Sequence, residues 1–322
     1  MAETSAAYSG SGPLAPGSVS LRLYPCPGSP SEQIDELREV ARLAEDIGYD
    51  GVMVSEHHAG FPGYLPNPTQ LAAFLLAATN RMWVAPCPLL LPLRARALVA
   101  EELAWLAAAY PGRVGAGFAA GALPVDFELA EVPFDEITQR FKDALPWVVG
   151  ALRGTVDGPL ADDAAVARCV EAPVPMVVAA QSPAACRRAA RLDLGVLYDS
   201  LQTEEVSAGL TAGFRQAGGL GPAVLIRRVW IGEPPAAAIE AQMAHYRSYA
   251  PESAMKNWDG DQLIAAPTAG EAAERLADFL DAARCDTVNV RIHVKDLTPD
   301  QVDDQLARHE GEFLSAIRGR LG

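Results

Sequence analysis

The stretch Gly48–Val84, GYDGVMVSEHHAGFPGYLPNPTQLAAFLLAATNRMWV, contains one complete unit of the predicted fold. Residues 49–55 form an apolar run that predicts a buried strand, and another such run begins at Arg81. Between these runs, Asn67 followed by Pro68 marks the start of a helix. A strand, a helix and a strand in this order predict two parallel strands joined by a helical crossover.

The same order of elements recurs on both sides of this unit. Ser29, Pro30 and Glu32 form a helix start with a capping box, and Gly48 ends that helix. We predict an α/β fold, a single (β/α)8 TIM barrel over residues 18–322, because roughly eight strand–helix units follow without a change in composition. An open doubly wound sheet is the alternative. Further strands are predicted at 19–26, 81–91, 113–118, 175–180, 195–200, 223–232 and 286–294. Further helices are predicted at 96–110, 133–153, 182–192 and from about Thr203, with two more between the last two strands and a closing helix after them.

The first 17 residues, MAETSAAYSGSGPLAPG, precede the predicted barrel. They have neither a basic start nor an apolar core, so they do not resemble a secretory signal. Their small and polar composition predicts a disordered N-terminal tail.

The overall composition limits the partners that we expect. The formal net charge of −15 argues against nucleic acid, which binds clustered lysine and arginine. The longest apolar runs are broken by proline and are too short to cross a bilayer, so we expect no membrane partner. The cysteines are scattered and form no CxxC pair, which suits a reducing, cytoplasmic location: Cys26, Cys87, Cys169, Cys186 and Cys285.

Two histidines, His57 and His58, follow Glu56 directly after a predicted strand. Active sites of such barrels lie at the C-terminal ends of the strands, so these residues are candidates for chemistry. Adjacent residues at a strand end point to opposite sides, which disfavours a shared metal ion. Either His57 handles protons at the barrel mouth, with Glu56 as its partner, or the histidines are ordinary hydrogen-bonded loop residues.

Three other segments follow predicted strands. The glycine-rich segment Gly112–Gly121 can bring backbone N–H groups close to a phosphate, although tight barrel turns also need glycine. Gln181 and Ser182 precede a helix whose free N–H groups favour an anion, although Ser182 is also an ordinary helix cap. Cys87–Pro88 is an irregular strand end.

Taken together, these segments resemble those of the luciferase-like flavin monooxygenases. The resemblance is carried by 48–84, by LLLPLRARALVAEELAWL, by GRVGAGFAAGALPVDF and by AQSPAACRRAARL, in the family's order and spacing. It implies a (β/α)8 barrel, often dimeric, that binds reduced FMN, or the deazaflavin F420 in a sister branch, at the strand C-termini. The EHH form is similar to the FMN-using branch.

The resemblance also implies roles for individual residues. His57 takes the place of the family's active-site histidine, while His58 points elsewhere. Cys87–Pro88 matches a position where the family often has a cis peptide beneath the flavin ring, and proline lowers the cost of such a bond from about 3–4 to about 0.5–1 kcal/mol, so we predict a cis bond here. The residues that the resemblance places at the cofactor are Cys87, Pro88, Gly117, Ala120, Gly121, Gln181 and Ser182.

One departure from the family concerns the cofactor phosphate. Ala120 stands where luciferase-type members carry an arginine, and loss of that cation weakens phosphate binding. Backbone amides and Ser182 would then hold the phosphate, aided by Arg187 or Arg188.

The function implied by the resemblance is that of a two-component monooxygenase. A separate flavin reductase supplies reduced FMN, O2 forms a flavin peroxide in a pocket poor in water, and one oxygen atom enters a small organic substrate. We also expect a homodimer. The alternatives are an F420-dependent oxidoreductase that transfers hydride, and a luciferase-like barrel that has lost productive flavin binding.

Overall fold

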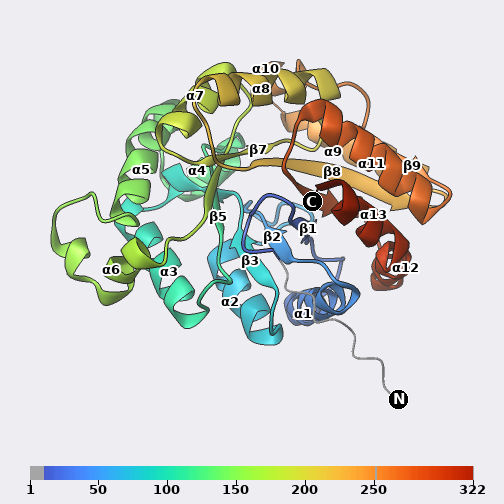
Figure 1. The fold of residues 1–322 in the computed structure, drawn as a ribbon, viewed down its shortest axis with the longest axis horizontal. Coiled ribbons are helices and arrows are strands. Elements are labelled where there is room, and N and C mark those ends of the chain that lie inside the picture. Colours follow the sequence, from blue (N-terminus) through green and yellow to red (C-terminus); the bar gives the residue numbers. More distant parts are fainter. Residues whose placement is uncertain (1–10, 251, 322) are drawn as a thin grey trace.

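A ring of parallel strands lies at the centre of the protein, and helices surround it (Figure 1). The computed structural model describes residues 11–250 and 252–321. The strands are β1 (Val19–Arg22), β2 (Gly51–Val54), β3 (Trp83–Pro86), β4 (Leu89–Leu90), β5 (Ala116–Ala119), β6 (Met176–Ala179), β7 (Gly195–Tyr198), β8 (Ala223–Ile231), β9 (Leu263–Ala266) and β10 (Thr287–Arg291). The helices are α1 (Pro30–Ile47), α2 (Pro68–Ala78), α3 (Arg96–Ala109), α4 (Pro124–Leu129), α5 (Ile137–Ala151), α6 (Ala164–Glu171), α7 (Pro183–Arg191), α8 (Glu204–Gln216), α9 (Ala236–Tyr249), α10 (Glu252–Met255), α11 (Ala269–Ala283), α12 (Pro299–His309) and α13 (Glu312–Leu321), with 3-10 turns η1 (Leu91–Leu93), η2 (Phe134–Glu136) and η3 (Pro159–Asp162).

The strands pair in the order β3-β2-β1-β10-β8-β7-β6-β5-β4, with β9 paired to β8 outside this path. β3 and β4 are two halves of one interrupted strand. β3 pairs with β2 and β4 pairs with β5, so this strand closes the sheet into a barrel. The predicted (β/α)8 barrel is therefore confirmed.

The helix starts are those that the sequence predicts. In α1 the side chain of Ser29 accepts from the Glu32 N–H while Glu32 completes the capping box, and Gly48 ends the helix with a φ of 104°. Asn67 caps α2. None of the described helices is long and apolar enough to cross a membrane.

Other predictions from the sequence need correction. The predicted strand 81–91 is divided into β3 and β4 at the Cys87–Pro88 bond, which is cis as predicted. The sequence did not predict α4, α6, α10, β9 or α13. Several of these elements are short, at six residues for α4 and four for β9, so they give little periodicity to recognise.

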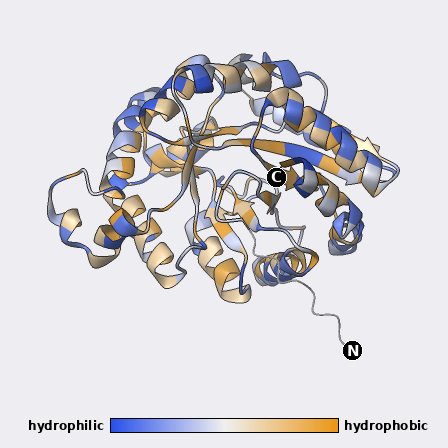
Figure 2. Cartoon of the chain, in the orientation of Figure 1, coloured by the Kyte–Doolittle hydropathy of each residue, from blue (hydrophilic) through white to orange (hydrophobic). Residues whose placement is uncertain are grey.

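Apolar side chains fill the lower part of the barrel, and Figure 2 shows that the central strands are mostly hydrophobic while the surrounding helices also carry hydrophilic sides. Trp83 is a large member of this interior cluster and is 2% exposed. It fits because Gly51 lies beside it: a Cβ on Gly51 would lie 2.0 Å from Trp83 Cδ2. The close approach explains why glycine begins β2.

Residues 11–17 close the floor of the barrel. Leu14 belongs to the interior cluster and is 1% exposed, and the Gly17 N–H donates to the carbonyl of Asp286 at 2.8 Å. The predicted disordered tail is therefore wrong for residues 11–17, because burial of Leu14 orders the chain there. The rest of the predicted tail, residues 1–10, lies outside the described residues.

We predict that Leu14→Ala destabilises the whole barrel. Removing a buried leucine side chain costs about 2–5 kcal/mol of unfolding free energy through lost burial and the cavity left behind. Urea denaturation followed by circular dichroism measures the loss. The matched control is Leu98→Ala on α3, where the leucine is 56% exposed and we expect a change within about 0.5 kcal/mol. Equal stabilities of the two variants would contradict the packed floor.

Candidate functional site

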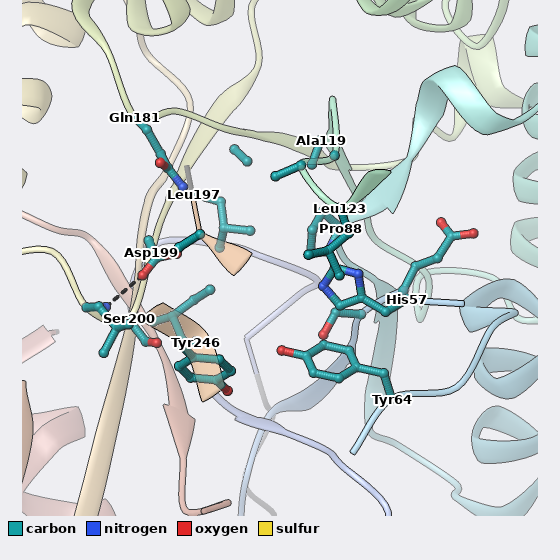
Figure 3. Close-up of a pocket in the computed structure, with 18 of the residues that line it drawn as sticks. His57, Tyr64, Pro88, Ala119, Leu123, Gln181, Leu197, Asp199, Ser200 and Tyr246 are labelled. Carbon is teal, nitrogen blue, oxygen red and sulfur yellow. Dashed lines mark hydrogen bonds between the residues drawn. The ribbon is translucent and has the colours of Figure 1, made fainter. Parts of the chain in front are cut away.

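A cavity of about 420 Å³ lies at the carboxyl ends of the strands. This volume is within the range of roughly 300–1,000 Å³ that is usual for ligand sites. Apolar residues supply much of the wall, among them Leu90, Leu197 and Ile226. Figure 3 shows His57 and Tyr64 on one side of the space, with Gln181, Asp199 and Tyr246 on the other. Tyr64 comes from the loop after His58.

His57 is held in one orientation by a buried carboxylate. Its Nδ1 lies 2.9 Å from Oδ2 of Asp126, which is 1% exposed, while Asp126 Oδ1 accepts from the His58 N–H at 2.8 Å. Because an ionised carboxylate only accepts hydrogen bonds, Nδ1 carries the proton. Nε2 has no hydrogen-bond partner among the described residues, so it is the nitrogen available to a ligand.

The predicted pairing of Glu56 with His57 is wrong. Glu56 Oε1 lies 3.0 Å from His58 Nε2 and 2.6 Å from Arg94 Nη2, and its Oε2 accepts from the Leu90 N–H at 2.7 Å. Glu56 therefore joins the loop after β2 to β4 and η1, although it also lines the cavity. The two histidine rings have different partners, so His58 points away from His57 as the family resemblance implies.

Two residues that the sequence placed at the cofactor lie in the barrel wall instead. Cys87 is fully buried and its carbonyl accepts from Arg22 Nη1 at 3.1 Å. Gly117 leaves room for it, since a Cβ there would lie 2.1 Å from the Cys87 sulfur. Neither residue lines the cavity, whereas Pro88 does. The glycine at 117 is thus explained by packing.

The other predicted cofactor residues lie at or beside the cavity. Ala120, Gly121 and Gln181 line it. Gly121 has a φ of 86°, and a Cβ there would lie 2.6 Å from Phe127 Cζ, so a turn and a close contact both require glycine. Ser182 caps α7, accepting from the Ala185 N–H at 3.3 Å, and is not part of the lining.

Two arginines in the cavity wall were not predicted from the sequence. Arg22, at the end of β1, is 3% exposed and donates to Asn289 Oδ1, Ser55 Oγ and the carbonyl of Cys87. Arg291, at the end of β10, is 4% exposed. Each arginine stands in an otherwise apolar strand, and this was the signal in the sequence. A charged residue in such a strand is placed among buried positions of the barrel, where arginine is rare.

Tyr24 lies between these arginines and was also missed. Its ring stacks on His293 with centroids 4.6 Å apart, and the Arg291 guanidinium lies 4.4 Å from its centroid. Burial acts to raise the pKa of Tyr24, but the charges of Arg291 and Arg22 outweigh it and hold the pKa below its usual value. In the same cavity, burial raises the pKa of Asp199, which follows β7.

We predict that Asp126→Asn reverses the tautomer of His57. The asparagine Oδ1 would still accept from the His58 N–H, which places the asparagine NH2 group beside His57 Nδ1. An NH2 group can only donate a hydrogen bond. The His57 proton then moves to Nε2. Nitrogen-15 NMR of histidine-labelled protein at alkaline pH reports which ring nitrogen is protonated.

Two further variants complete this test. His57→Ala assigns the signal, and Asp143→Asn, at an exposed position on α5, is the matched control that should leave the tautomer unchanged. An unchanged tautomer in Asp126→Asn would contradict the orienting role of Asp126.

Comparisons with known proteins agree with this architecture. The family model of luciferase-like monooxygenases matches residues 17–312. An F420-dependent glucose-6-phosphate dehydrogenase of Microbacterium testaceum is 32% identical over 211 residues, 58% of this chain and 61% of that protein. The alkanal monooxygenase alpha chain of Photorhabdus laumondii is 31% identical over 113 residues, 35% of this chain and 32% of that protein. The chain thus spans about three fifths or less of these relatives.

Solved structures with the same fold are more distant in sequence. The oxygenating constituent of a 3,6-diketocamphane monooxygenase from Pseudomonas putida, solved with FMN, has a TM-score of 0.75 at 17% identity and covers 93% of this chain and 98% of its own. An F420-dependent secondary alcohol dehydrogenase has a TM-score of 0.70 at 16% identity, with the same coverage. At these identities the similarity establishes the fold. The family match extends over most of the barrel, and the chain therefore belongs to the luciferase-like monooxygenase family.

Proposed function

We propose that the protein is a two-component monooxygenase that uses reduced FMN and O2. A separate reductase would supply the reduced FMN. One oxygen atom would enter a small organic substrate and the other would leave as water, with both electrons coming from the reduced flavin.

The observation that carries this proposal is the His57–Asp126 pair beside a largely apolar cavity. The pair presents Nε2 of the His57 imidazole to the space that Pro88 also lines. An imidazole whose other nitrogen is bound to a buried carboxylate can take up a proton at Nε2, because the carboxylate stabilises the resulting charge. The apolar part of the wall would limit the access of water to a bound flavin, which an oxygenation needs to avoid side reactions.

The residues around the cavity fit an FMN molecule. Small residues lie at the carboxyl ends of β5 and β6, where Ala119, Ala120, Gly121 and Ala179 line the cavity, so a flat ring system can approach the backbone. When bound, reduced FMN would supply the oxygen-activating chemistry.

The phosphate of FMN would be held near the start of α7. Gln181 lines the cavity there, and the Ser182 hydroxyl retains a donor while it caps the helix. Because Ala120 provides no cation, backbone N–H groups would supply more of the hydrogen bonds to the phosphate. Arg188 lies over the Phe141 ring at 5.5 Å and Arg187 is exposed on the same helix.

F420-dependent hydride transfer is the second candidate function. It is supported by the F420-dependent glucose-6-phosphate dehydrogenase that is 32% identical over 211 residues. His57 would serve this reaction as well, because hydride transfer from an alcohol releases a proton that Nε2 could accept. The EHH sequence favours FMN.

Anaerobic titration distinguishes the two cofactors. We expect saturable binding of reduced FMN, followed by flavin absorbance, with an affinity at least tenfold higher than that of reduced F420. Tighter binding of F420 would overturn the FMN assignment in favour of the second candidate. Binding of neither cofactor would overturn both and leave a barrel without flavin chemistry.

We predict that His57→Ala separates cofactor binding from turnover. The side chain makes its hydrogen bond to Asp126, so its loss should change the affinity for reduced FMN by no more than about twofold. Product formation should fall by about 10²–10⁴-fold, the usual contribution of a positioned proton-transfer group. Oxygen consumption and product yield measure the effect. His58→Gln is the control, because His58 contacts Glu56, and unchanged turnover in His57→Ala would exclude the proposed role.

A further inference from the structure

Four buried arginines lie in or beside the barrel mouth without an ion-pair partner. They are Arg22, Arg227, Arg228 and Arg291, each at most 4% exposed. In the described part of the chain, no carboxylate oxygen lies within 4 Å of any of their nitrogens. The partners that they do have are neutral acceptors such as carbonyls, amides and hydroxyls. Buried cations normally pair with an anion, so this arrangement needs an explanation.

Arg22 and Arg291 are the two that reach the cavity. Arg291 donates to the Tyr246 hydroxyl and to the carbonyl of His293, and its Nη1 has no hydrogen-bond partner among the described residues. Arg22 Nη2 contacts only the Met53 sulfur, at 3.7 Å. A guanidinium nitrogen with unused N–H groups at a cavity wall is a donor for an incoming ligand.

Burial and the neighbouring guanidinium charges together shift the pKa values of the surrounding groups. Burial, and then the charge of Arg291, lowers the pKa of Arg228 to about 10. Burial lowers the pKa of His293 to well below its usual value, and Arg291 and Arg228 add to the shift. The nearby acids form no ion pair with these cations. Glu56 is paired with Arg94, and burial raises the pKa of Asp199 although the charges of Arg291, Arg227 and Arg22 act to lower it.

The position of the arginines separates them from the expected phosphate site. Arg22 ends β1 and Arg291 ends its neighbour β10. In the order of the barrel strands β1 lies opposite β6, whose loop carries Gln181 and Ser182. The arginines therefore face a different part of the cavity, where Tyr24, Tyr246 and Ile226 supply aromatic and apolar surface.

We propose that Arg22 and Arg291 bind the acidic head group of the substrate, which is a small organic oxyanion, a carboxylate or a sulfonate, with an apolar body. The planar guanidinium of Arg291 suits two oxygens of such a group. The apolar body lies against Ile226 and the tyrosine rings. The inference rests on the proposed function only in calling this ligand the substrate, because the anion site exists without a cofactor.

The test measures binding of probe anions to the protein without flavin. The probes are benzoate, hexanoate and benzenesulfonate, each compared with its neutral amide, and sodium chloride matches the ionic strength. We expect at least one anion to raise the melting temperature in a saturable way while its amide does not. If no anion exceeds the chloride control, or if amides bind equally well, the proposal is overturned.

Variants locate the binding in the cavity. Arg291→Gln should weaken the binding of the best probe by roughly ten- to a hundredfold, the loss expected for a charge-assisted hydrogen bond. Arg308→Gln is the matched control, because Arg308 is on α12 and pairs with Asp304 on the surface, and it should bind as the parent does. Asp199→Asn should bind the probe more tightly, since it removes a carboxylate charge that acts on both arginines. Equal binding by all three variants would place the anion elsewhere.

A last comparison separates the substrate from the cofactor. If Arg291→Gln loses reduced FMN and the parent binds no probe anion, the arginines serve the flavin ring and the substrate proposal is overturned. If the parent binds probe anions but no flavin, the proposed monooxygenase function fails while the anion site stands.

Discussion

Closure of the barrel through the interrupted strand β3–β4 is the constraint on which the site depends. Its first half pairs with β2 and its second half with β5. The loop after β2 carries His57 and the segment after β5 carries Asp126, so the two residues meet only because this strand joins their neighbours into one ring. Glu56 adds a further link between the loop after β2 and this interrupted strand. Its carboxylate accepts from the Leu90 N–H in β4, the half that pairs with β5 and not with β2.

The barrel interior is divided between an apolar floor and a polar mouth. Leu14 and Trp83 fill the lower part, while a column of hydrogen bonds rises along β1 and β10 from Ser20 through Asn289 to Arg22. Each polar side chain in this column is bonded to the next, which is the condition for burying it. The column ends at the cavity, where the charge of Arg22 has no carboxylate partner. The packed floor therefore stabilises the barrel, while the mouth provides the polar groups that can bind a ligand.

The sequence predicted those features that depend on neighbouring residues. Helix starts such as Ser29 and Asn67 were recognised because a cap and its partner lie within three residues. The position of His57 followed from the rule that barrel sites lie after strands. The Asp126 carboxylate was missed because α4 is only six residues long and lies 69 residues from His57 in the chain. Gly117 was misplaced because a glycine that admits a neighbouring sulfur looks the same in sequence as one that admits a phosphate.

The most direct test of the account is rapid mixing of the protein, loaded anaerobically with reduced FMN, with O2, followed by flavin absorbance. We predict that reoxidation passes through a transient that free reduced FMN does not show, because the cavity would shield the bound flavin from bulk water and His57 would control the proton. Reoxidation with the same rate and spectra as free flavin would contradict it.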